Sequence, residues 1–374
     1  MFYQKIIYLI FFACILPIGQ ASNNLLDDES VQIYKHKESS KMFIDDILDK
    51  KLTKKKRKQV NTVRILSVDG CAMRGIIPAT ILKIIEEQTK QPISKLFHIV
   101  GGSSFGCMLT SGLTIPSDDN PLAPKWSAND LINQFKDQSH KIFKRYIPFL
   151  PFCNSDSLES ATIECCGNTT FDQSITPTLG VTFDCIKSET KSICSWEEEE
   201  IFRTQDVMLA SSANPIVFGP RFLNPINQEA ANHCYMASNN SLDSNDQLMI
   251  LIAKARKLYP KAKRFEIVSL GSGVVHTQIF RDLFQSVLNF SNYFLRIFNL
   301  GLNTIPLVSE SQIGSIIFGY YTRIDPTIPG QCSQLDPSSK NIEMLEKAIF
   351  EHLKIKENNQ QFSDLLKRLS AEKD

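Results

Sequence analysis

The sequence predicts an α/β fold in which a mostly parallel sheet is flanked by helices. Short, apolar, β-branched runs alternate with segments of helical periodicity along most of the chain. Glycine-containing turns stand where predicted strands pass into predicted helices. The chain is 374 residues long and 43% hydrophobic, which allows a substantial core. Such alternation builds sheets that are covered on both faces and that carry their sites at the carboxyl ends of the strands.

The predicted elements begin at Val63, because the run Val63–Val68 has the composition of a buried strand. Pro78–Gln88 follows with apolar residues at helical spacing and charged residues on the opposite face. The further predicted elements are the strands Leu96–Val100, Gly180–Ile186 and Phe265–Leu270 and the helices Gly106–Leu113 and Gln247–Leu258.

The N-terminal segment Met1–Ala21 is interpreted as a secretory signal peptide. Lys5 precedes the apolar stretch Ile6–Ile18, and Gly19–Ala21 supplies the small residues that a signal peptidase recognises. The stretch is shorter than the roughly 20 residues that a membrane-spanning helix needs. The expected localisation is therefore export, to the periplasm or the medium; an uncleaved N-terminal anchor is the alternative.

Charge and cysteine content exclude several other classes of protein. The net charge is +1, so no broad basic surface predicts nucleic-acid binding. The basic run Lys54–Lys58 is interpreted as part of a solvated linker, with a patch for anionic lipid or a partner as the alternative. The ten cysteines show no metal-binding spacing, and neither a metal nor a cofactor is expected. Disulfides and free thiols both remain open.

The segment Gly102–Gly106 reads G-x-S-x-G between a predicted strand and a predicted helix. In this context the two glycines, Gly102 and Gly106, allow a sharp turn that presents the serine above the sheet at a helix N-terminus. Ser104 is therefore the candidate nucleophile.

A second turn, Asp69–Gly75, also joins a strand to a helix. Backbone N–H groups of such a loop can converge on an oxyanion, although an ordinary turn is the alternative. The candidate residues of this loop are Gly70, Cys71, Ala72, Arg74 and Gly75.

Together these two segments, about 35 residues apart, resemble the patatin-like phospholipase family, whose loop reads D-G-G-G-x-R-G and whose elbow reads G-T-S-x-G. The resemblance runs in order from about residue 62 to residue 370. Together with the composition of the N-terminal segments, it divides the chain into four expected parts: the signal peptide at 1–21, a polar basic linker at 22–61, a patatin-like domain at 62–275, and a C-terminal helical part of the same module at 276–374. Further segments that are similar to the family are Ile76–Leu82, Pro92–Phe97, Ala210–Pro215, Lys257–Pro260, Val268–Gly273 and Tyr320–Pro326.

The resemblance implies a lipid acyl hydrolase with a serine–aspartate dyad and a lipid or membrane-surface substrate. In that chemistry the serine attacks an ester carbonyl, the aspartate acts as base, and the glycine-rich loop stabilises the oxyanion. Ser104 corresponds to the nucleophile, Gly70 with positions 71 and 72 to the oxyanion loop, and Arg74 to the arginine of that loop.

The chain departs from the family pattern at the position of the dyad aspartate. Counting back from Leu258–Pro260 places Ser238 on the aspartate, and a serine hydroxyl cannot act as the base at neutral pH. Asp243 and Asp246 are the candidate substitutes, although Asp246 also suits the start of a helix.

Three further departures lie near the same site. Cys71 and Ala72 replace two loop glycines, which is costly wherever the backbone needs positive φ. His98 replaces a family aspartate, and His233 lies near the lost carboxylate; both are interpreted as structural rather than as substitute bases. Two hypotheses follow: an active hydrolase with rearranged groups, or a non-catalytic scaffold that binds lipid or a protein whose identity the sequence does not indicate.

Overall fold

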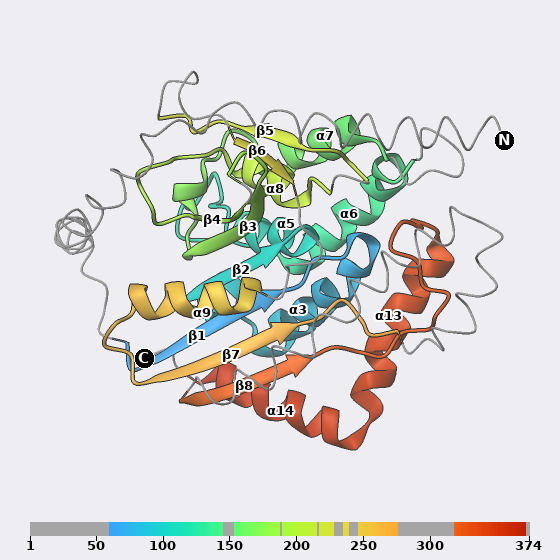
Figure 1. Ribbon diagram of the computed structural model, residues 1–374. Coiled ribbons are helices and arrows are strands. Elements are labelled where there is room, and N and C mark those ends of the chain that lie inside the picture. Colours follow the sequence, from blue (N-terminus) through green and yellow to red (C-terminus); the bar gives the residue numbers. More distant parts are fainter. Residues whose placement is uncertain are drawn as a thin grey trace. The chain divides into compact units, whose positions relative to one another are not determined.

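The computed structural model describes residues 60–144, 153–187, 189–214, 217–227, 235–238, 246–275 and 318–371. Within these ranges a mostly parallel sheet of eight strands has helices on both faces, which confirms the predicted fold class (Figure 1). The predicted signal Met1–Ala21, the basic run Lys54–Lys58, His233 and Asp243 lie outside the described residues.

The strands are β1 (Thr62–Val68), β2 (Ile99–Ser103), β3 (Thr178–Asp184), β4 (Glu189–Cys194), β5 (Arg221–Leu223), β6 (Tyr235–Ser238), β7 (Arg264–Leu270) and β8 (Gly319–Ile324). The α-helices are α3 (Ile76–Thr89), α4 (Ile93–Leu96), α5 (Phe105–Gly112), α6 (Ala128–Ile142), α7 (Ser155–Cys166), α8 (Thr204–Ser212), α9 (Asp246–Leu258), α13 (Ser339–Lys354) and α14 (Lys356–Ser370). Two short 3₁₀ helices are η1 (Ala72–Gly75) and η2 (Phe171–Gln173).

Strand β1 lies at the centre of the sheet, between β2 and β7, and runs parallel to both. Outside β7 lies β8, also parallel, and outside β2 lies β3. The side chains of β1 alternate between two cores, as the pleat of a strand requires. Val63 and Ile65 pack with α9, whereas Leu66 and Val68 pack in a larger core with α3, α5, α6, α13 and α14. Figure 1 shows α9 and α3 on opposite faces of the sheet. Burial on both faces explains why apolar residues occur on both sides of β1 rather than on alternate positions only.

Strand β3 changes partners along one of its two sides. On one side, β3 pairs with β4 from Leu179 to Asp184. The other side pairs with β2 up to Ser103↔Val181 and then with β6 from Ser238↔Phe183. Strand β6 therefore joins the sheet just beyond the point at which β2 leaves it. This change of partner brings the end of β2, at Ser103, close to the end of β6, at Ser238.

Two sequence predictions need correction. The strand predicted at Leu96–Val100 begins only at Ile99, because Leu96 ends α4 and Phe97 links that helix to the strand. The strand then continues through Gly101 and Gly102, which have low β propensity but are buried in the sheet. In addition, the C-terminal part contributes a strand, β8, as well as the expected helices.

A buried ionic network ties the last helix to the sheet. Arg64, on β1, donates hydrogen bonds to the backbone carbonyls of Arg368, Leu369 and Ala371 at the end of α14. Glu266, on β7, is only 4% exposed and lies 2.6 Å from Arg368 and 3.4 Å from Arg64. The guanidinium of Arg64 therefore caps the C-terminal end of α14, where positive charge is favourable.

The Glu86 carboxylate caps two helices at once. Its two oxygens accept hydrogen bonds from the backbone N–H groups of Ile93, at 3.0 Å, and Ala128, at 2.8 Å, in the first turns of α4 and α6. We expect Glu86→Ala to lower the free energy of unfolding by about 2 kcal/mol, about 1 kcal/mol for each lost cap. Urea unfolding measures this. The control Glu87→Ala removes only a surface pair with Lys83 and should change stability by less than about 0.5 kcal/mol.

Candidate active site

Ser104 stands at a strained turn between β2 and α5. Its backbone has φ 51° and ψ −127°, a conformation that non-glycine residues rarely adopt. The turn is as tight as the G-x-S-x-G pattern predicts. A Cβ on Gly106 would lie 2.1 Å from the Val68 carbonyl oxygen, and one on Gly102 would lie 2.4 Å from the Gly106 carbonyl carbon. The half-buried serine is thus presented at the carboxyl edge of the sheet, at the N-terminus of α5.

The predicted oxyanion loop lies against this turn. A Cβ on Gly70 would meet the Ser103 carbonyl oxygen at 2.0 Å and the Ser104 Cβ at 2.5 Å, so only glycine fits there. Gly75, at the end of the loop, packs equally closely on the Phe105 ring, 1.9 Å from a would-be Cβ. Loop and elbow are therefore in direct contact, as two motifs of one site must be.

The other loop residues point mainly toward the C-terminal part of the chain. The N–H of Met73 donates to the Gln334 carbonyl. Arg74 is only 3% exposed, and its guanidinium lies 3.5 Å from the Cys332 carbonyl oxygen. Burial raises the pKa of the Cys71 thiol, against the lowering effect of nearby Arg74. Cys71 is therefore a protonated, buried thiol at neutral pH and not a second nucleophile.

Ala72 occupies a backbone conformation that favours glycine. Its φ is 43°, where a side chain is disfavoured by roughly 1–2 kcal/mol. This is the cost expected when the family's loop glycines are replaced by residues with side chains.

We expect Ala72→Gly to raise the free energy of unfolding by about 1 kcal/mol, because glycine adopts positive φ without strain. Urea denaturation of the purified chain measures the change. Ala161→Gly, in the right-handed helix α7, is the matched control and should have the opposite sign, a loss of about 1 kcal/mol. Destabilisation of similar size in both variants would contradict the assignment of strain to Ala72.

The structure brings Ser238 toward the Ser104 turn. Ser238 pairs with Phe183, two residues beyond the pair Ser103↔Val181 and on the same side of β3. At about 3.3 Å per residue, the backbone of Ser238 lies roughly 6.6 Å farther along β3 than Ser103. Of the two candidate substitutes, the backbone of Asp246 begins α9, and Asp243 lies outside the described residues.

Asp69, the acidic residue of the loop, forms an ion pair on the side of β1 that faces β7 and β8, away from β2. Its carboxylate lies 2.7 Å from the guanidinium of Arg323 on β8, which also lies 2.7 Å from Asp325 and donates to Ser269. Burial raises the pKa of Asp69, and Arg323 lowers it. Gln247, at the start of α9, donates to the Val68 carbonyl beside this group. The network fixes the beginning of the loop and holds the Asp69 carboxylate toward β8.

His98 lies at the end of β2 opposite to Ser104. It is buried, and its Nδ1 accepts a hydrogen bond from the Arg64 N–H at 2.9 Å. The Tyr259 hydroxyl donates to its backbone carbonyl. His98 therefore has a structural role between β1 and α9.

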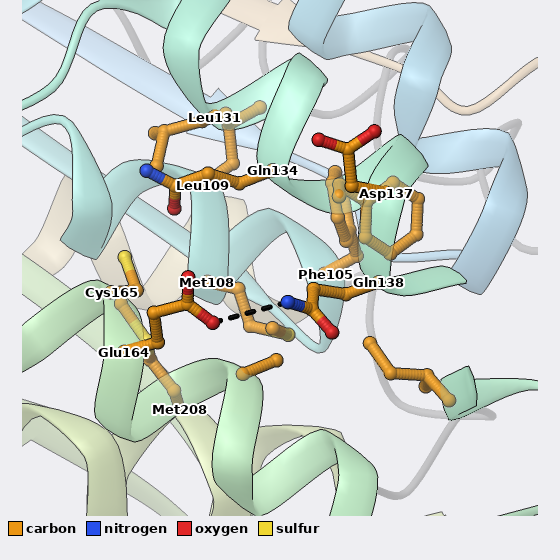
Figure 2. A pocket seen from close by; sticks show the side chains of 13 residues that line it. Phe105, Met108, Leu109, Leu131, Gln134, Asp137, Gln138, Glu164, Cys165 and Met208 are labelled. Atoms are coloured by element: carbon orange, nitrogen blue, oxygen red, sulfur yellow. Dashed lines mark hydrogen bonds between the residues drawn. The ribbon is translucent and has the colours of Figure 1, made fainter. Parts of the chain in front are cut away.

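An apolar pocket of about 110 Å³ lies beside α5, between that helix and α6, α7 and α8. Figure 2 shows Met108 and Met208 among the side chains that line it, and the hydrogen bond from Gln138 to Glu164, at 3.1 Å. Phe105 lines the pocket, whereas Ser104 does not. The pocket is thus next to the elbow helix but separate from the carboxyl edge of the sheet.

Ser211, on α8, contacts the elbow directly, and the sequence did not single it out. Its hydroxyl oxygen accepts the N–H of Ser104 at 2.9 Å and donates to the Val181 carbonyl at 2.6 Å. The only sequence signal was the family-like segment Ala210–Pro215, in which this serine lies.

Three further findings concern disulfides, metal ligands and membrane-spanning helices. The eight cysteines within the described ranges form no disulfide with one another. Those ranges also contain no group of three or more His, Cys, Asp or Glu side chains placed to hold a metal ion. None of the helices that the structure describes is both long enough and apolar enough to span a bilayer.

A mostly parallel sheet with a serine held at positive φ between strand and helix is the scaffold of an α/β hydrolase-related protein. The profile of the family described as patatin-like phospholipase matches residues 66–237, and its match ends one residue before Ser238. Residues 66–237 of this chain are therefore similar to the patatin-like phospholipase family, which the curated relatives also support.

Curated relatives agree with this assignment. Patatin-2-Kuras 1 of Solanum tuberosum is 29% identical over 172 residues, which are 43% of this chain and 46% of that protein. Patatin-like protein 2 of Oryza sativa subsp. indica is 24% identical over 260 residues, 60% of this chain and 64% of that protein. The chain thus matches less than two thirds of each relative. Among solved structures, VipD from Legionella pneumophila aligns with a TM-score of 0.36 and 12% identity, over 82% of this chain and 67% of that one.

Proposed function

We propose that this chain is a lipid acyl hydrolase that uses Ser104 as its nucleophile and works slowly because the family's carboxylate base is replaced by Ser238. The observation that carries the proposal is the conformation of Ser104, at φ 51° against Gly70. Such strain costs about 1–3 kcal/mol and is typical of functional sites. A scaffold without chemistry would gain stability by relaxing it.

The reaction would proceed as acyl transfer to Ser104. The Ser104 oxygen attacks the ester carbonyl carbon, and its proton passes to solvent because no carboxylate occupies position 238. The oxyanion is stabilised by the N–H groups of Gly70, Cys71 and Ala72, since those of Asp69 and Met73 donate to backbone carbonyls. Collapse of the tetrahedral intermediate expels the lipid alcohol, which takes up a proton. Water then hydrolyses the acyl ester on Ser104, which releases the fatty acid and regenerates the serine.

Covalent labelling tests the nucleophile. A fluorophosphonate probe should label the purified chain slowly and on the peptide that contains Ser104. Ser104→Ala should abolish labelling and the release of fatty acid from short-chain esters and phospholipid vesicles. Ser103→Ala, which removes the neighbouring buried hydroxyl, should remain labelled. Absence of label in the wild-type chain, with equal ester turnover in the Ser104→Ala variant, would refute the proposal.

A second candidate is a non-catalytic patatin-fold protein that binds lipid or a protein partner. Ser238 at the family's aspartate position and the strained Ala72 in the loop favour it. It predicts that phosphatidylcholine vesicles sediment equally with the wild-type chain and with Ser104→Ala, and that neither chain releases fatty acid.

Export through Met1–Ala21 remains part of the proposal. The signal-like composition of that segment supports it. Mass spectrometry of the N-terminus of the expressed protein, recovered outside the cytoplasm, should show cleavage after Ala21; an intact N-terminus would contradict it.

A further inference from the structure

The hydrogen-bond ladder between β2 and β3 is interrupted where β2 ends. The N–H of Val100 donates to the Pro177 carbonyl, and the register carries the ladder on through Gly102↔Gly180. In a parallel ladder this pattern advances two residues at a time. The next bond would join the N–H of Ser104 to the carbonyl of Val181.

The hydroxyl of Ser211 lies between these two groups. It accepts from the Ser104 N–H at 2.9 Å and donates to the Val181 carbonyl at 2.6 Å. The chain turns away from β3 at Ser104, so the direct bond is replaced by a bridge through one side-chain oxygen. Both backbone groups thereby keep a partner in a buried place, where an unmade hydrogen bond is costly.

The bridge is rigidly held. Ser211 is 1% exposed, and α8 is tied to β3 by a second bond, from the Thr182 hydroxyl to the Ala210 carbonyl at 2.9 Å. A hydroxyl has a single proton, and the bond to Val181 uses it. The Ser211 oxygen can therefore act only as an acceptor toward Ser104, and it accepts the hydrogen bond from the Ser104 N–H.

We infer that Ser211 is a positioning residue that holds the Ser104 elbow in its positive-φ conformation, at the point where β2 leaves the sheet. The geometric part of this inference stands on the two hydrogen bonds, and its consequence for reactivity rests on the proposed function of Ser104. Loss of the hydroxyl frees the Ser104 N–H and lets the turn relax, while β2 itself remains paired with β1.

Hydrogen exchange tests the geometric part. In Ser211→Ala we expect the amide of Ser104 to exchange about tenfold faster, the effect of losing one hydrogen bond, with unchanged exchange in β1. The matched control is Ser212→Ala, because Ser212 is also buried, at 3% exposure, and its hydroxyl has no hydrogen-bond partner among the described residues. That variant should leave exchange at Ser104 unchanged. Unchanged exchange at Ser104 in Ser211→Ala, or an equal increase throughout the chain, would overturn the inference.

The rate of fluorophosphonate labelling tests whether Ser211 affects the reactivity of Ser104. The rate of fluorophosphonate attachment to Ser104 should fall about tenfold in Ser211→Ala and stay at the wild-type value in Ser212→Ala. Equal rates in the two variants would overturn the positioning role. If Ser211→Ala does not fold, Ser211→Cys keeps a weaker donor and acceptor and should show a smaller increase in exchange at Ser104. A wild-type chain that takes no label refutes the proposed function alone, since hydrogen exchange still decides whether Ser211 holds the elbow.

Discussion

Replacing Ser238 by Asp is expected to raise the rate of ester hydrolysis at Ser104 by about 10²- to 10⁴-fold, the usual contribution of a positioned general base. The reason is the place of Ser238 in the sheet, two residues beyond Ser103 along the same side of β3. We expect a carboxylate there to accept the proton of the Ser104 hydroxyl, which the natural serine cannot do at neutral pH. Steady-state hydrolysis of a short-chain ester at pH 7 measures the gain.

Two control variants test whether the gain requires the carboxylate at position 238 and the Ser104 nucleophile. Ser238→Asn has nearly the shape of Asp but no basic carboxylate, so its rate should stay at the wild-type value. The double variant Ser104→Ala/Ser238→Asp should show no gain, because the base has no nucleophile to activate. Equal rates for the Asp and Asn variants would mean that position 238 does not face Ser104.

Replacing Arg323 by Met is expected to lower the free energy of unfolding by about 3 kcal/mol, because it leaves an uncompensated pair of carboxylates. Arg323 is the cation between Asp69 and Asp325, each 2.7 Å from its guanidinium. The Asp69 side chain retains 26% exposure, which favours the lower end of the range for broken buried pairs. Urea unfolding at pH 7 measures the loss.

The loss in this variant should shrink as the pH falls from 7 toward 4. Burial raises the pKa of Asp69 above its ordinary value of 3.8, and Arg323 opposes that rise. Without Arg323 the pKa in the folded state rises further. A carboxyl whose folded-state pKa exceeds its unfolded-state pKa destabilises the fold increasingly as the pH climbs from the lower value through the higher one. The penalty is therefore largest above the folded-state pKa and absent below the unfolded-state pKa.

The matched control is Arg221→Met, which removes a more exposed ion pair with Glu159. Its cost should be under about 1 kcal/mol, as for surface pairs in general. An equal loss in the two arginine variants, or a loss in Arg323→Met that does not change between pH 7 and pH 5, would contradict the role assigned to the Asp69–Arg323–Asp325 network.

Much of the fold was predictable because its signals are local. The β-branched run at Val63–Val68 and the helical periodicity at Pro78–Gln88 both correspond to elements found in the structure. The prediction failed for β2, where Leu96–Val100 was expected. Its apolar run belongs partly to the end of α4, and glycines that disfavour strands in isolation are buried within the sheet. Tertiary packing decided that boundary.

The sequence by itself determined the fold class, and it predicted the elbow around Ser104, the loop around Gly70 and the missing carboxylate at position 238, because each of these signals lies in a short run of residues. Only the tertiary structure decided that β6 meets β3 where β2 leaves it, that Asp69 faces Arg323, and that Ser211 bridges the interrupted ladder. The Ser104–Ser211 and Asp69–Arg323 contacts join residues that are more than 100 positions apart in the chain, and β6 pairs with β3 across more than 50 positions. Local periodicity carries no information about such pairs, since they form only when helices and strands close around a common core.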